Sequence, residues 1–410
     1  MQIRTNPGRW LTAKRLRAYG TILAVCLWSV YVWNLATPGL RDRSGNLKGT
    51  DFLHFYTLGS LAVEHRGSDL YDMDAQAALA AQRVPAAAGT RYLPLYPPQV
   101  SLLFAPLAHL SYDWALALWW SVSASIYGAC CFYIWRVCPR LCGYGALVAL
   151  LAVAFPGFFH LIAWGQTSAL ALACFTAMFF LLRERREFLA GLVLGCLIFK
   201  PQLGLAAGIV FVAAGAWKTV LGAILSAVAQ LSTGAFYYGT EPLRRWVHMM
   251  LNVRGVLPLL EPRPYQTHCL RTFWSLLIPW PGLSFGLYVA SAIAALGMAI
   301  GCWRRNGTPL ALRYSSLLLA TVLVAPHLTV YDLVVLAPAF LLLADWLAGQ
   351  GSSPVNGWLG FLLYLVYMLP LLGPLTRWTH VQLSVIAIGA TLYAIFQLRS
   401  QETEPQRTGS

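Results

Sequence analysis

Charged side chains are scarce in this sequence, so those that stand beside apolar segments are the first candidates for chemistry. The clearest is Asp51 in the stretch GTDFLHFY, residues 49–56, which follows the first long apolar run. A carboxylate at this place could accept a proton from an attacking hydroxyl group, as a general base does. Thr50 or Asp51 could instead cap a helix over about 52–64, which would not exclude catalysis. His54 follows one turn later on the same side.

A second candidate is Lys200, inside the apolar segment 188–214. A lysine at membrane depth costs about 2.5–3.5 kcal/mol, which favours a role for it. Its ammonium group could extend to the membrane surface and bind carbonyl groups that Pro201 leaves free, or it could bind a phosphate. Arginines of a later polar segment offer the same charge, namely Arg244, Arg245 and Arg254. They could equally form the polar face of an amphipathic helix on anionic headgroups.

The composition sets the class of protein. Hydrophobic residues make up 58% of the chain and charged residues 11%, and the mean hydropathy is +0.60. Because soluble domains have about a quarter of their residues charged, this chain is predicted to be a polytopic membrane protein. In a membrane protein, the basic residues behind the net charge of +14 set the orientation of the spans. No run of alternating basic and aromatic residues indicates binding of nucleic acid. Cys138 and Cys142 lack a second pair or a histidine cluster, so we predict no zinc site there. We also predict no cofactor.

Apolar runs of about 20 residues can cross a membrane as helices. Such runs cover 17–37, 113–136, 143–163, 167–182, 188–214, 218–238, 283–302, 309–325, 329–347, 356–373 and 379–397. The segment 188–214 is interrupted at Lys200-Pro201-Gln202 and is either one kinked helix or a pair of short helices. The hairpin puts the basic loops on the cytoplasmic side and is therefore preferred. We predict an all-α transmembrane bundle of about 12 spans counting the hairpin. It forms one domain over 1–397, and a polar cytoplasmic tail covers 398–410.

On this map, two long segments lie outside, and short helices of the outer interface are expected in them: 38–97 and 239–272. All eight histidines fall at or near the same face: His54, His65, His109, His160, His248, His268, His327 and His380. These residues could be polar only because loops are exposed to water. Ionisable groups that converge at membrane depth, however, often mark a functional cavity. The sequence therefore predicts a site at the outer rim.

Other polar residues interrupt the apolar pattern near the same rim. His327 stands beside Pro326, with Asp332 five positions later, and could be only a polar helix end. Gln166 and His160 line a comparable outer turn. The side chains predicted to bind a substrate beside Asp51 are His54, Tyr56, His160, Gln166, Lys200, Gln202, Arg244, Arg245, His327 and Asp332.

Several short motifs occur in an order that resembles glycosyltransferase family 87. They are the acid of GTDFLHFY, then GSDLYD, YPP, WGQ and KPQ, over roughly 45–215, with a looser match at APHLTVYDLVVLAP. The resemblance implies a membrane enzyme of the GT-C class in the plasma membrane. The charges of the loops, and not the resemblance, put both termini in the cytoplasm. It implies inverting transfer of a hexose, with mannose favoured, from a polyprenyl-phosphate donor to a glycolipid or glycan acceptor on the outer face. Asp51 would be the general base, and no metal would be needed.

The chemistry of the residues is compatible with that implication. A phosphate leaving group is already a stable anion, so one carboxylate and a cationic phosphate site suffice. Three other interpretations stay open: a transporter or flippase, a non-catalytic relative, and an enzyme that moves a whole glycan. A transporter predicts two related halves and ionisable residues near the bilayer midplane, and no second half repeats the first.

Overall fold

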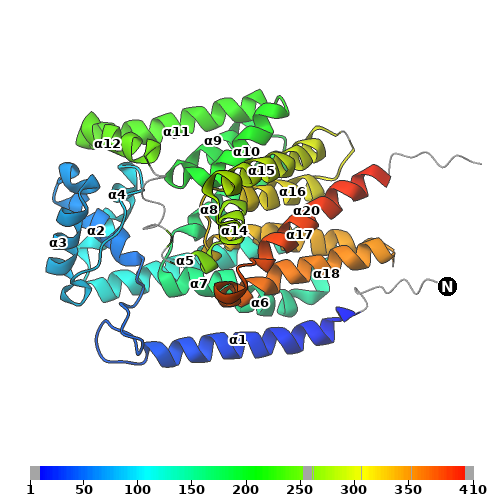
Figure 1. Ribbon diagram of the computed structural model, residues 1–410, viewed down its shortest axis with the longest axis horizontal. Helices are drawn as coiled ribbons and strands as arrows, with labels where there is room; N and C mark the ends of the chain where they lie inside the picture. Colours follow the sequence, from blue (N-terminus) through cyan, green and yellow to red (C-terminus); the bar gives the residue numbers. More distant parts are fainter. Residues whose placement is uncertain (1–9, 253–260, 262, 306, 352, 402–410) are drawn as a thin grey trace, which may run out of the picture.

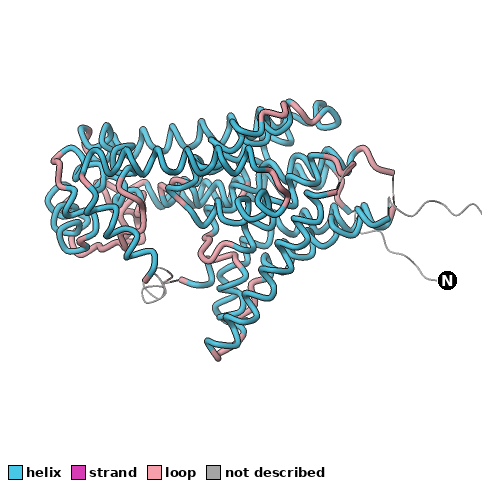
Figure 2. The backbone as a smooth tube through the Cα atoms, turned by 90° about the horizontal axis from the view of Figure 1, so that it is seen from above, coloured by secondary structure: helices cyan, strands magenta, loops and turns pink. Residues whose placement is uncertain are grey.

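The protein is an all-α bundle of membrane-spanning helices, most of which run along the long axis of the molecule (Figure 1, Figure 2). The computed structural model describes residues 10–252, 261, 263–305, 307–351 and 353–401. Within these residues, the β structure is limited to two isolated bridges, Arg41 with Leu47 and Thr267 with Thr329. The prediction of an all-α membrane protein is confirmed.

The predicted spans match observed helices within a few residues. Among the described residues, six helical stretches are long and apolar enough to cross a membrane: α1 (Ala13–Leu35), α5 (Tyr112–Arg136), α11 (Trp217–Tyr238), α15 (Pro281–Arg304), Val330–Ala348 including α17 (Ala337–Ala348), and Pro354–Thr379 including α18 (Pro354–Met368) and α19 (Thr376–Thr379). A seventh would be α6 (Gly145–Ala154) with α7 (Pro156–Trp164), which meet at a bend of 49°. Shorter apolar helices complete the bundle: α8 (Ser168–Arg183), α9 (Glu187–Gly195), α10 (Pro201–Ala213), α16 (Leu310–Val324) and α20 (Leu383–Gln401).

The segment 188–214 forms a hairpin that turns at Lys200. The start of α11 lies beside the start of α9, where the Thr219 hydroxyl donates to the Glu187 carbonyl over 3.1 Å. Farther along the two helices, a Cβ on Gly195 would lie 2.3 Å from the Ala223 carbonyl oxygen, so α9 and α11 run parallel in close contact. Because α11 starts at the level where α9 began, α10 must lead back from Lys200 to that level.

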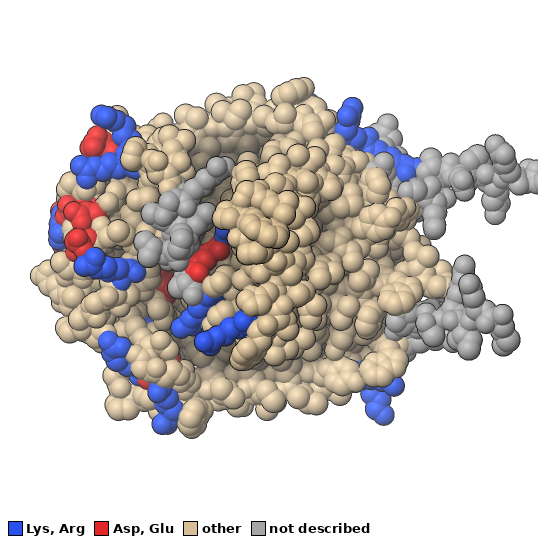
Figure 3. All heavy atoms as spheres, in the orientation of Figure 1, with Lys and Arg blue, Asp and Glu red and all other residues tan. Residues whose placement is uncertain are grey.

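The two ends of the bundle differ. The beginning of α1 and the end of α20 lie at the same end (Figure 1). The opposite end carries α2 (Phe52–Val63), α3 (Met73–Arg83), α4 (Gln99–Phe104) and α12 (Thr240–Leu251). On the face drawn in Figure 3, acidic atoms gather at this second end and in a hollow near the centre. On this face, the acidic side chains thus lie away from the end where α1 begins.

The helix predicted over about 52–64 exists as α2, but it does not lie along a surface. Its side chains from Phe52 to Ala62 are all buried. The segment up to the start of α5 wraps around it: Phe55 stacks on Phe104, and a Cβ on Gly59 would lie 2.3 Å from the Phe104 carbonyl oxygen. Apolar residues surround this short helix on every side, so it is a core element. Asp51 stands immediately before it.

Candidate active site

A tight turn between α7 and α8 receives the first turn of α2. Gly165 closes α7 with φ +69°, a left-handed conformation that glycine adopts without strain. A Cβ at this position would lie 2.7 Å from the Cβ of Phe52, so only glycine allows α2 to approach so closely. The Asp51 amide donates to the Trp164 carbonyl over 3.0 Å. The sequence WGQ therefore places Asp51 against Gln166.

Asp51 uses its carboxylate in this contact and not as a helix cap. It precedes α2 but makes no side-chain capping bond, so the capping interpretation is wrong for Asp51. Instead, Gln166 Nε2 donates to Asp51 Oδ2 over 2.5 Å. The Asp51 side chain remains partly accessible, although packed helices surround it. A small polar group can therefore reach this carboxylate.

The surroundings of Asp51 make it a stronger base than an ordinary aspartate. Burial raises the pKa of Asp51 to about 6, against the hydrogen bond from Gln166 and the charge of Lys200, which lower it. Asp332 adds to the increase and Arg263 opposes it. At neutral pH the carboxylate is mostly ionised, with a proton affinity that suits a general base.

Lys200 and Asp332 form a buried ion pair next to Gln166. Lys200 Nζ lies 2.8 Å from Asp332 Oδ1, with side chains 4% and 3% exposed. Lys200 Nζ also donates to Ser168 Oγ over 3.0 Å and to Gln166 Oε1 over 3.5 Å, and Ser168 Oγ donates to Asp332 Oδ1 over 2.5 Å. Four segments of the chain thus meet in one cluster, which we call the base cluster: Asp51, Gln166, Ser168, Lys200 and Asp332.

Local backbone structure holds both members of this ion pair. Lys200 precedes a proline, which disfavours the helical conformation at Lys200. Its backbone is non-helical (φ −134°, ψ 70°), and the chain turns there into α10. Asp332 lies in the first turn of the 3-10 helix Val330–Leu336, and its Oδ2 accepts from the Thr329 amide over 3.2 Å. The Tyr331 ring lies 5.1 Å from Lys200 Nζ and adds a cation–π contact.

A second polar cluster, the arginine cluster, lies nearby and consists of Glu261, Arg271, Thr272 and His327. Arg271 pairs with Glu261, and His327 Nδ1 lies 2.7 Å from Glu261 Oε1. Burial raises the pKa of Glu261, but the hydrogen bond from His327 and the charges of His327 and Arg271 lower it by more, so it ends below its ordinary value. Arg271 and His327 are 17% and 15% exposed. Glu261 therefore acts as a counterion.

The chain brings the two clusters together through one β-bridge. Thr267 pairs with Thr329, and the His268 amide donates to the Leu328 carbonyl over 2.8 Å. This bridge joins the end of the second long polar segment to the residues between His327 and Asp332.

The other predicted residues lie elsewhere. His54 is buried, and no described residue forms a hydrogen bond with its ring nitrogens. Its ring lies 5.2 and 5.7 Å from those of Tyr92 and Tyr96. Tyr56 donates its hydroxyl to the Leu110 carbonyl over 2.8 Å. His160 is partly buried against Phe159, and Gln202 is partly buried beside Lys200. In α12, Arg244 and Arg245 pair with Glu241 at 3.5 and 3.1 Å, and Arg254 lies outside the described residues.

Sequence reasoning missed Ser168, Glu261 and Arg271. Ser168 starts α8 directly after the Gly-Gln turn, so a hydroxyl at that position was a usable signal. Glu261 and Arg271 belong to a polar segment without helical periodicity, and nothing local marks them. Within the described residues, no three His, Cys, Asp or Glu side chains lie close enough to hold a metal ion.

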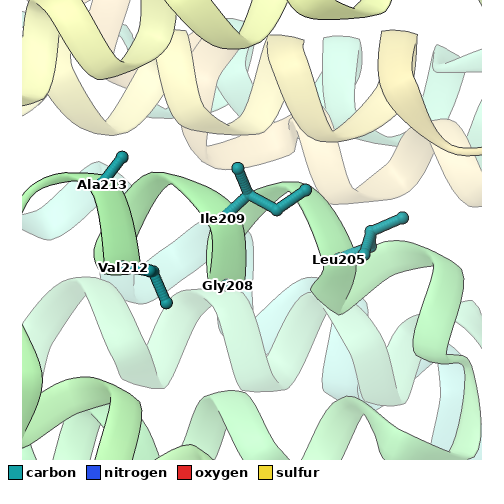
Figure 4. Close-up of a pocket in the computed structure, with 5 residues that line it drawn as sticks. All are labelled: Leu205, Gly208, Ile209, Val212 and Ala213. Carbon is teal, nitrogen blue, oxygen red and sulfur yellow. The ribbon is translucent and has the colours of Figure 1, made fainter. Parts of the chain in front are cut away.

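An apolar depression on α10 is not part of this site. Its lining consists of Leu205, Gly208, Ile209, Val212 and Ala213 (Figure 4). None of these side chains is polar, and Leu205 and Val212 are about half exposed, as on a helix face that contacts lipid. The depression offers no group for catalysis.

Comparison with known proteins bears on the chemistry of the base cluster. No curated protein and no solved structure matches the chain. The family model of glycosyltransferase family 87 matches residues 95–326, which include Gln166, Ser168, Lys200, Glu261 and Arg271. Asp51 and Asp332 lie outside the matched range, and both contact residues within it. The match covers more than half of the chain, and the chain therefore belongs to glycosyltransferase family 87, whose members are membrane glycosyltransferases.

Proposed function

We propose that this protein transfers a hexose, with mannose favoured, from a polyprenyl-phosphate donor to a glycolipid or glycan acceptor, with inversion. The observation that carries the proposal is the Asp51 carboxylate, which is accessible, has a raised pKa and has Oδ2 held by Gln166. A single held carboxylate suits a reaction with one proton transfer, from the acceptor hydroxyl as it attacks the anomeric carbon.

In the proposed reaction, Asp51 accepts the proton of the acceptor hydroxyl while its oxygen bonds to the anomeric carbon. The bond from that carbon to the donor phosphate breaks, and the electron pair leaves with the phosphate. The leaving phosphate is a stable anion and needs nearby positive charge rather than a strong acid. Attack from the face opposite the phosphate inverts the anomeric centre, and one carboxylate is then sufficient.

Positive charge is available on one side of Asp51. Arg263 is exposed and within electrostatic range of Asp51, and Arg271 and His327 are partly exposed in the adjacent arginine cluster. Lys200 adds the field of its buried ammonium group. Arg244 and Arg245, at the same end of the bundle in α12, suit contact with anionic headgroups next to the site. We propose that the donor phosphate binds between Arg263 and the arginine cluster.

The test of the reaction uses purified protein in lipid nanodiscs with radiolabelled polyprenyl-phosphate mannose or glucose and a membrane-lipid extract. Transfer of label to a lipid or glycan product is expected. Asp51→Asn should lower the rate of transfer by about 10²–10⁴-fold, because Asn keeps the shape and loses the basicity. Asn356→Asp at the start of α18 is the matched control, since it makes the reverse exchange away from the site. Equal turnover in wild type and Asp51→Asn would contradict the proposed role of Asp51.

The proposal also places the site on the outer face of the plasma membrane and both termini in the cytoplasm. Gln82 is exposed in α3 at the site end, and Cys142 is exposed in the loop before α6 at the other end. In intact cells, a membrane-impermeant maleimide should label Gln82→Cys, and Cys142 should react only after permeabilisation. Labelling of Cys142 alone in intact cells would reverse the proposed orientation.

A further inference from the structure

We infer that Gln166 and Lys200 are positioning residues that link the Lys200–Asp332 ion pair to Asp51 and leave Oδ1 of Asp51 as the proton acceptor. The inference rests on the proposed function of Asp51 as the base. It assigns Lys200 a different task from direct binding of the donor phosphate.

The first argument is the donor count of Lys200. A lysine ammonium group has three N–H donors and no acceptor. Its three partners are Asp332 Oδ1 at 2.8 Å, Ser168 Oγ at 3.0 Å and Gln166 Oε1 at 3.5 Å. Lys200 is 4% exposed, so a phosphate could reach it only by replacing one of these partners. The arrangement is that of a group that holds other side chains in place.

The second argument is the orientation of the Gln166 amide. Its Oε1 accepts from Lys200, and its Nε2 donates to Asp51 Oδ2 over 2.5 Å. The flipped amide would face the ammonium group with its own N–H donors and the carboxylate with its oxygen, and both contacts would be repulsive. Lys200 therefore favours the orientation that bonds Oδ2, together with the Thr167 amide, which donates to Gln166 Oε1 over 3.4 Å. The described residues place no hydrogen bond on Oδ1, which is left for the acceptor hydroxyl.

The third argument is electrostatic. The groups that influence Asp51 are Gln166, Lys200, Asp332 and Arg263. The charge of Asp51 acts in turn on four phenols around it, those of Tyr92, Tyr96, Tyr112 and Tyr331. The ring of His54 on α2 packs against Tyr92. Burial raises the pKa of Asp51, and the Gln166 hydrogen bond and the Lys200 charge are the first two influences that lower it. Loss of either should therefore favour the protonated form of Asp51.

The experiment measures the ionisation of Asp51 directly. The carboxyl band is followed by infrared spectroscopy as the pH is changed. The difference between each protein and its own Asp51→Asn derivative gives the midpoint of Asp51 ionisation in the absence of substrate. Gln166→Met should raise that midpoint by about one pH unit or more. Lys200→Met combined with Asp332→Asn avoids an unpaired buried charge and should raise it by a smaller amount. Gln230→Met, the same exchange in α11, should leave it unchanged.

A midpoint equal to that of wild type in either variant would overturn the inference. So would a Lys200→Met/Asp332→Asn protein whose KM for the donor rises while its titration is unaltered, because that pattern identifies a phosphate ligand. The titration needs no turnover, and it therefore remains informative if no lipid-phosphate sugar is a substrate. Absence of transfer would contradict the proposed function, whereas an unmoved midpoint would contradict only the positioning roles.

Discussion

Asp51 and Glu261 are carboxylates in adjacent clusters, and their surroundings differ in nearly every respect. Glu261 is bonded by Arg271 and His327, and these two residues lower its pKa below the ordinary value despite burial. Asp51 is bonded by a neutral amide, and burial raises its pKa to about 6. The nearest ammonium group, Lys200, is already paired with Asp332. One carboxylate is neutralised by direct contact, and the other is kept apart from direct cationic contact.

This difference separates two uses of an acid at a site. A carboxylate in direct contact with cations is a poor proton acceptor, because its charge is already stabilised. A carboxylate that only an amide holds keeps its basicity and its orientation. The comparison therefore supports the proposed role of Asp51 as the base and suits Glu261 to positioning Arg271 and His327.

The largest expected difference between Asp51 and Glu261 is in the turnover of variants that neutralise each acid. Asp51→Asn should lower kcat by about 10²–10⁴-fold, the usual contribution of general base catalysis. Glu261→Gln should lower it by no more than about 10²-fold, since it only misplaces groups beside the site. In wild type and Glu261→Gln, kcat/KM should fall on acidification with a midpoint at about 6, where Asp51 takes up its proton. A larger loss of kcat in Glu261→Gln than in Asp51→Asn would contradict the comparison. So would a Glu261→Gln protein whose kcat/KM no longer falls on acidification.

The sequence allowed the elements of the fold to be predicted because span length and charge asymmetry are properties of contiguous residues. The hairpin at Lys200 followed from the basic loops on either side of it, before any contact was known. The position of Asp51 before a short helix was predictable for the same reason. The burial of α2 was not predictable, because a helix of mixed aromatic and small residues has the same sequence pattern at a membrane interface and in a protein core.

The partners within the site could not be predicted, since they join distant parts of the chain. Asp51 meets Gln166 across 115 positions, and Lys200 meets Asp332 across 132. Each residue was recognised singly as a polar interruption, but the pairing depends on how α2, α8 and α10 pack. Lys200 was therefore predicted to bind an anion, and the structure shows that its ammonium group already pairs with a carboxylate.

The thermal unfolding temperature should change in opposite directions when Asp51 and Glu261 are neutralised. The expected changes are smaller than those in turnover. The folded protein raises the pKa of Asp51 to about 6, above the value of about 3.9 in an unfolded chain, so ionised Asp51 disfavours folding. That penalty grows between about pH 4 and pH 6, so Asp51→Asn should raise the thermal unfolding temperature at pH 8 and leave it nearly unchanged at pH 4. Glu261→Gln should lower it at pH 8, because the depressed pKa of Glu261 stabilises the folded state above its unfolded value. If Asp51→Asn also unfolds at a lower temperature at pH 8, Asp51 is a stabilised counterion like Glu261, and its assignment as the base loses its electrostatic support.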